Sequence, residues 1–200
     1  MTIISKLEAA HRQIATAIKL YFDDDDVAAI HTLACASREI YEKQCEHEGL
    51  ERLFSLIESA NSDRSRKELW DILNGPRNFL KHPDSNRDLS AQLELDDEMN
   101  ATMIFYACHD CAILCKNKSP PEVDAFSLWY IQTRFPLDFV EEVIEPENQA
   151  KEEARLRAVE GYRAVERNYP GLRSAKLSKQ KQIGKQMVKD ARNIHDSLCP

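Results

Sequence analysis

Apolar residues recur at steps of three and four along most of this chain, and that spacing constrains the fold more than any other feature. The first such stripe consists of Ile4, Leu7, His11, Ile14, Ile18 and Tyr21. A repeat of this kind places side chains on one face of an α-helix, whereas a half-buried strand needs strict alternation. The 200 residues include only 5 Gly and 8 Pro and no run of alternating β-branched residues, so the sequence predicts an all-α protein.

Turn residues divide the repeat into segments, which predicts an up-and-down helical bundle of about six to eight helices. Asp26, the last residue of the acidic run DDDD, is a candidate N-cap for a second helix, and Gly49 is a candidate stop. The first two helices would then form an antiparallel hairpin. Later helices are expected over residues 50–57, around 69–73, from Glu98 for about 20 residues, from the prolines at 120–121, and over 136–145.

Gly75 and Pro76 interrupt one stripe. Proline fits best in the first turn of a helix, so the residues that follow are expected to open a short helix or to follow a kink. Pro83 disfavours the α conformation at the residue before it, which places His82 at a helix end.

The charge is distributed unevenly along the chain. The net charge is −7, but residues 151–200 carry 12 Lys and Arg against 6 Asp and Glu, and residues 1–150 therefore carry 15 against 28. We expect a helical bundle domain over residues 1–146, followed over 147–200 by a charged helix and a basic tail that is helical only where it docks. An acidic body is a poor general binder of polyanions, so any nucleic-acid contact must be local or use the tail. Residues 173–192 are either a solvated or self-docking tail or a contact for RNA or an acidic partner.

The cellular compartment is predicted from two features that the sequence lacks, a membrane span and an apolar N-terminal segment. No apolar stretch reaches the roughly 20 residues that a membrane span needs, and the N-terminus has no apolar core before its charges begin. The chain is therefore expected to be cytoplasmic, without a membrane contact. The 6 cysteines are expected to be free thiols.

The stretch RNFLKH carries the residues best suited to chemistry, namely Arg77, Asn78 and His82. A guanidinium can hold phosphate oxygens and stabilise charge in a transition state, and a histidine can transfer a proton at neutral pH. On a straight helix Asn78 and His82 lie within about 40° of each other, whereas Arg77 and His82 diverge by about 140°. Arg77 and His82 of one chain therefore cannot easily hold one small group, unless a kink or a second copy of the segment brings them together.

This pattern resembles the motif of HEPN domains, helical bundles whose ribonuclease members carry Arg, a polar residue, three variable residues and His. The opening hairpin is also similar in style to that family, and the resemblance covers about residues 3–115. It implies a HEPN-like fold, a homodimer in which two motifs line one cleft, and RNA binding or metal-independent endoribonuclease activity through Arg77, Asn78 and His82. The alternative is a non-catalytic helical scaffold or interaction module that binds a protein or small ligand, in which the same three residues are structural.

Other polar groups favour structural roles. Cys108, Cys111 and Cys115 share one face of a predicted helix, and a single straight helix cannot surround a tetrahedral metal ion, so a seam of small packed residues is expected. His11 and His31 lie on or beside apolar stripes and are expected to be hydrogen-bonded at helix contacts. The sequence predicts no metal site and no cofactor.

Overall fold

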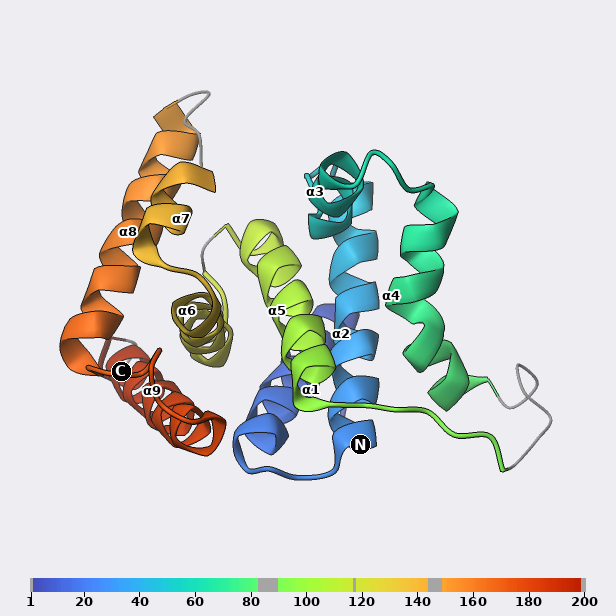
Figure 1. The fold of residues 1–200 in the computed structure, drawn as a ribbon, viewed down its shortest axis with the longest axis horizontal. Helices are drawn as coiled ribbons and strands as arrows, with labels where there is room; N and C mark the ends of the chain where they lie inside the picture. Colours follow the sequence, from blue (N-terminus) through green and yellow to red (C-terminus); the bar gives the residue numbers. More distant parts are fainter. Residues whose placement is uncertain (1, 83–89, 117, 144–148, 199–200) are drawn as a thin grey trace. The chain divides into compact units, whose positions relative to one another are not determined.

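The computed structural model describes residues 2–82, 90–116, 118–143 and 149–198, and within these ranges it contains nine helices and no strand (Figure 1). The all-α prediction is therefore confirmed. The helices are α1 Lys6–Phe22, α2 Val27–His47, α3 Leu53–Ala60, α4 Arg66–Lys81, α5 Asp97–Leu114, α6 Pro121–Arg134, α7 Leu137–Val143, α8 Gln149–Asn168 and α9 Leu177–Leu198.

The chain separates into two compact units, Met1–Val123 and Asp124–Pro200. The domain boundary expected at 146/147 lies outside the described residues. In the first unit α2 is the central helix: it packs along α1 and α5, and α4 lies on the side of α2 opposite α5 (Figure 1).

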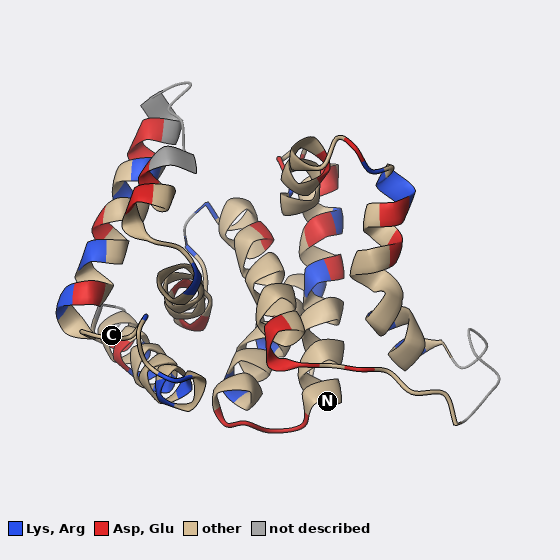
Figure 2. Cartoon of the chain, viewed as in Figure 1, with Lys and Arg blue, Asp and Glu red and all other residues tan. Residues whose placement is uncertain are grey.

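Local side-chain caps determine where several helices of the first unit begin. The Asp26 carboxylate accepts a hydrogen bond from the Ala29 amide at 2.7 Å, which confirms it as the N-cap of α2. Figure 2 shows the acidic turn that this residue ends. Ser65 and Glu68 form a reciprocal capping box at the start of α4. Gly49, with φ at +66°, follows the last residues of α2 as expected for a helix stop.

The centre of the first unit is filled by side chains of α1, α2 and α5. The buried cysteines on α2 are Cys35 and Cys45, and those on α5 are Cys108 and Cys111. Small residues let helices approach closely, so these thiols form part of the apolar contact, as the sequence indicated. The sixth cysteine, Cys199, lies outside the described residues.

Helix α4 runs without a break through Gly75 and Pro76, so the expectation that a short helix opens at this point is wrong. The alternative, a kink, stays a prediction. Pro76 costs the helix one hydrogen bond, to the carbonyl of Ile72. Contacts on both sides of it keep the helix continuous. Before it, Trp70 packs edge-to-face on Phe54 of α3 with ring centroids 5.3 Å apart, and after it Arg77 forms an ion pair with Glu39 of α2.

In the second unit the basic C-terminal segment is an ordered helix with a buried face. Met187 and Val188 of α9 are buried, and the indole N–H of Trp129 in α6 donates a hydrogen bond to the Gln180 carbonyl at 2.8 Å. The segment is therefore a helix packed on α6, which agrees with the self-docking alternative and not with a solvated tail. Among the helices that the structure describes, none combines the length and apolarity that crossing a membrane requires.

Candidate functional site

The RNFLKH residues lie in the last turns of α4, and Arg77 is the one turned towards a neighbouring helix. Its guanidinium contacts the Glu39 carboxylate of α2 through Nε and donates a hydrogen bond from Nη1 to the Asn78 side-chain oxygen at 2.9 Å. His82 is the C-cap of the helix, as predicted, and its backbone N–H bonds to the Asn78 carbonyl at 3.0 Å. The His82 side chain is exposed. The structure thus brings Arg77 and Asn78 together at α2 and places His82 at the helix end.

Arg77 also lines a large groove of the first unit, with a volume of about 1340 Å³. Asn78 and His82 do not line it. The walls come from α1, α2, the C-terminal half of α4 and the end of α5. The apolar lining residues are Leu7, Cys35, Ala36, Ile40, Leu50, Leu80, Leu114 and Cys115. Most are aliphatic and none is aromatic, so the groove offers a hydrophobic surface without a stacking platform.

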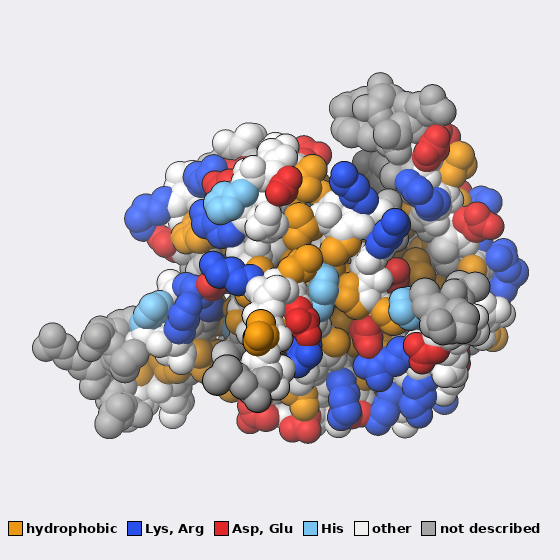
Figure 3. Space-filling view, turned by 180° about the vertical axis from the view of Figure 1, so that it is seen from behind, with side chains coloured by type: hydrophobic (Ala, Val, Ile, Leu, Met, Phe, Trp, Pro, Cys, Tyr) orange, Lys and Arg blue, Asp and Glu red, His pale blue; other side chains and the backbone are white. Residues whose placement is uncertain are grey.

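Basic side chains outnumber acidic ones in the groove lining, whereas acidic residues outnumber basic ones in the first 150 residues as a whole. The cationic side chains are Lys6, Lys43, Arg77, Lys81 and Lys116, with His47 beside them, against two acids, Glu39 and Glu48. The first 150 residues as a whole carry 15 Lys and Arg against 28 Asp and Glu. On the side of the molecule drawn in Figure 3, Lys and Arg side chains stand next to exposed hydrophobic ones. The groove lining therefore combines an excess of basic over acidic side chains with an apolar surface.

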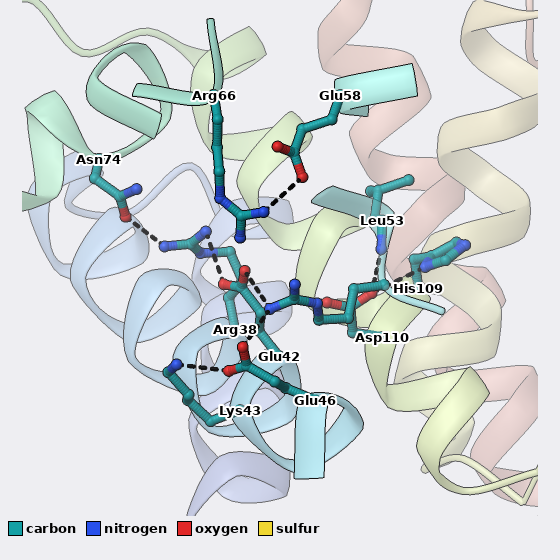
Figure 4. A network of polar contacts seen from close by, with 11 residues as sticks. Arg38, Glu42, Lys43, Glu46, Leu53, Glu58, Arg66, Asn74, His109 and Asp110 are labelled. Carbon is teal, nitrogen blue, oxygen red and sulfur yellow. Dashed lines mark hydrogen bonds and ion pairs between the residues drawn. The ribbon is translucent and has the colours of Figure 1, made fainter. Parts of the chain in front are cut away.

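A buried polar network fastens α4 to α2 one turn before Arg77 (Figure 4). Arg38 of α2 is 0% exposed, and it donates hydrogen bonds to the Asn74 side-chain oxygen at 2.5 Å and to a Glu42 carboxylate oxygen at 3.3 Å. Its guanidinium also lies over the Tyr106 ring, 5.1 Å from the centroid. The second cation near Glu42 is Arg52, at 3.7 Å. Because these groups are buried, we assign them to the architecture that supports the groove.

Asp110 of α5 extends the network to α3. One of its carboxylate oxygens accepts a hydrogen bond from the Leu53 amide at 2.9 Å, and the Nδ1 of His109 lies 3.1 Å from the same oxygen. Burial raises the pKa of Glu42, while the charges of Arg38 and Arg52 oppose that rise.

The two histidines of the first helices have partners at helix contacts, as expected. His11 Nδ1 lies 2.8 Å from the Tyr41 hydroxyl, and His31 Nδ1 lies 3.1 Å from the Asn100 side-chain oxygen. Burial lowers the pKa of both imidazoles. They belong to the interior contacts of α1, α2 and α5.

The cysteines are free thiols in the part of the chain that the structure describes. Burial raises the pKa of Cys35 and of Cys45 to about 11, which suits buried apolar residues better than nucleophiles or metal ligands. Within the described ranges no three His, Cys, Asp or Glu side chains gather where they could hold a metal ion.

Sequence reasoning found Arg77 but missed the groove around it. Its lysines come from separate helices, with Lys6 on α1, Lys43 on α2 and Lys116 after α5. No linear motif joins them. The i,i+4 spacing of Arg38 and Glu42 was a detectable signal of an ion pair, but not of its burial.

Comparison of the chain with models of protein families, with curated proteins and with solved structures gives no match.

Proposed function

We propose that the first unit is an interaction module whose groove binds an acidic amphipathic helix of a partner protein. The observation that carries the proposal is the concentration of five Lys and Arg side chains around an aliphatic lining, in a part of the chain that is otherwise acidic. An amphipathic helix docks its apolar face in a hydrophobic groove, and acidic residues beside that face would meet the cations.

The size of the groove favours a peptide over a small molecule. Pockets for small ligands usually measure about 300–1,000 Å³, and this groove, at about 1340 Å³, is larger. The apolar residues of its lining are mostly aliphatic, which suits the leucine-rich face of a helix.

The second candidate function is RNA binding or metal-independent RNA cleavage by a homodimer, with Arg77, Asn78 and His82 in the roles implied by the resemblance to HEPN domains. It is favoured by the position of Arg77 among the lysines of the groove and by the exposed His82 at the end of the same helix. We rank it second because the described groove-lining residues include no Phe, Tyr or Trp ring on which a base would stack.

Peptide binding tests the first candidate. The probe is a fluorescent peptide of about 15 residues with leucine at every third or fourth position and glutamate between, and its control is a scrambled peptide of the same composition. We expect the ordered peptide to bind, and Lys81→Glu to weaken binding by about tenfold or more through charge reversal in the groove. The matched control is Lys67→Glu, which changes an 84% exposed lysine of the same helix that does not line the groove. Equal binding of the ordered and scrambled peptides would eliminate the proposal.

RNA cleavage tests the second candidate, with a single-stranded RNA as substrate and a chelator present throughout. If the motif is catalytic, His82→Ala abolishes cleavage and Arg77→Ala lowers it by about two to three orders of magnitude, whereas Asn78→Ala has a smaller effect. Cleavage that persists in His82→Ala would exclude this site. A strictly monomeric protein by light scattering at high concentration would remove the composite cleft.

A further inference from the structure

We infer that Glu39 occupies the place in the groove that a carboxylate of the bound acidic helix takes, so that it is a built-in competitor which regulates binding. This inference rests on the function proposed above. Glu39 projects from α2, and the two cations that it contacts, Arg77 and Lys81, project from α4. All three residues line the groove.

The contacts of Glu39 are those that an incoming carboxylate would make. One carboxylate oxygen contacts Nε of Arg77, and the other lies 3.8 Å from Nζ of Lys81. A glutamate or aspartate on a docked helix has the same two oxygens and the same charge, so it can replace Glu39 without changing the number of charges on these cations.

The exposure of the contact permits this exchange. The side chains of Glu39, Arg77 and Lys81 are 31%, 21% and 55% exposed, and although Nε of Arg77 is itself buried, a released Glu39 carboxylate can be solvated. An ion pair of this exposure contributes only about 0.2–1 kcal/mol, which is small enough for a ligand to displace. Molecules in which Glu39 contacts Arg77 and Lys81 are not ready to bind the acidic helix. The apparent affinity for that helix is therefore lower than it would be without Glu39.

The two halves of α4 are attached to α2 by different contacts. The half before Gly75 is fixed to α2 by the hydrogen bond between Arg38 and Asn74. The half after it contributes the groove residues Arg77, Leu80 and Lys81. Pro76 separates the halves and removes one helical hydrogen bond, so release of Glu39 frees the later turns while the earlier ones stay fixed.

The test compares Glu39→Gln with Glu48→Gln in the full chain, using the ordered leucine–glutamate peptide. Both substitutions remove one negative charge from the groove lining, but only Glu39 contacts Arg77 and Lys81, whereas Glu48 accepts a hydrogen bond from Gln44. We expect Glu39→Gln to tighten binding by about three- to fivefold, and Glu48→Gln by less than about twofold. In the absence of peptide, amide hydrogen exchange over residues 77–81 should be faster in Glu39→Gln than in the wild type.

The outcomes separate this inference from the function on which it rests. If the wild type binds the peptide and the two variants tighten binding equally, the effect is general electrostatics, and the competitor role of Glu39 is refuted while the groove remains a binding site. Unchanged affinity and unchanged exchange in Glu39→Gln refute the competitor role as well. If neither the wild type nor Glu39→Gln binds the ordered peptide better than the scrambled one, the proposed function and this inference fail together.

Discussion

Replacement of the buried Arg38 by methionine should destabilise the first unit strongly. The substitution Arg38→Met removes the hydrogen bond to Asn74 and the ion pair with Glu42. The Glu42 side chain, which is 4% exposed, then has Arg52 at 3.7 Å as its remaining cationic neighbour. Breaking a buried pair by removing one partner typically costs about 3–5 kcal/mol, because the other charge stays buried without compensation. We expect a loss of unfolding free energy in that range at neutral pH.

Tryptophan fluorescence during urea unfolding measures this loss in the first unit alone. The chain has 2 tryptophans, so a Trp129→Phe background leaves Trp70 of α4 as the single reporter. Arg38→Met is then compared with Arg12→Met, which removes an arginine whose side chain is 60% exposed and paired with Glu8. The control should change the unfolding free energy by no more than about 0.5 kcal/mol.

Two further measurements test the reason for the loss. In the double variant Arg38→Met/Glu42→Leu the uncompensated carboxylate is absent, so at least about 2 kcal/mol of unfolding free energy should be recovered.

The pH dependence of the unfolding free energy is a second, independent test. Glu42 has a folded-state pKa above 4.5, so its contribution to stability is complete below that pH and is lost as the pH rises through the folded-state pKa. Without Arg38 the folded-state pKa of Glu42 rises further. The loss of unfolding free energy caused by Arg38→Met should therefore be smaller near about pH 5 than near about pH 7.

The reasoning would be refuted if Arg38→Met cost less than about 1 kcal/mol, or if the double variant were no more stable than the single one.

Other predictions concern thiols, the C-terminal helix and the buried histidine. In Ellman titration of the native protein near about pH 8, the half-buried Cys115 should react well before Cys35, whose pKa burial raises to about 11; equal rates would contradict the assigned burial. Truncation after Gly171 removes α9 and the hydrogen-bond acceptor of Trp129, so the fluorescence of Trp129 should shift to the red, and an unchanged spectrum would show that α9 is not part of that core. The pKa of His31 is lowered in the folded state, so stability should fall as the pH drops below 6.5, and His31→Gln should reduce that fall as measured by thermal unfolding across pH.

The features of the fold that sequence could predict are those set by local contacts. The Asp26 cap, the stop near Gly49 and the position of His82 at a helix end each depend on a few neighbouring residues, and the structure has all three. The all-α class likewise follows from a repeat that most of the sequence contains.

The features that sequence could not predict depend on distant partners. Pro76 marks a helix break by its own chemistry, but Glu39 and Arg38 of α2 hold α4 on either side of it. The segment of α9 looks polar in isolation because only part of its surface is apolar, and Trp129 supplies the contact that fixes it. The candidate site follows the same rule, since Arg77 was visible as part of a motif whereas the lysines that surround it were not.

The backbone conformation of Lys116 has a cost in folding free energy at the edge of the groove. This residue follows α5 with φ at +50°, in the left-handed region where a side chain costs about 1–2 kcal/mol and glycine or asparagine is the usual choice. A chain optimised for stability alone would carry glycine there. A design programme that scores folding energy alone would replace this lysine, and it would thereby remove one of the five Lys and Arg side chains of the groove lining.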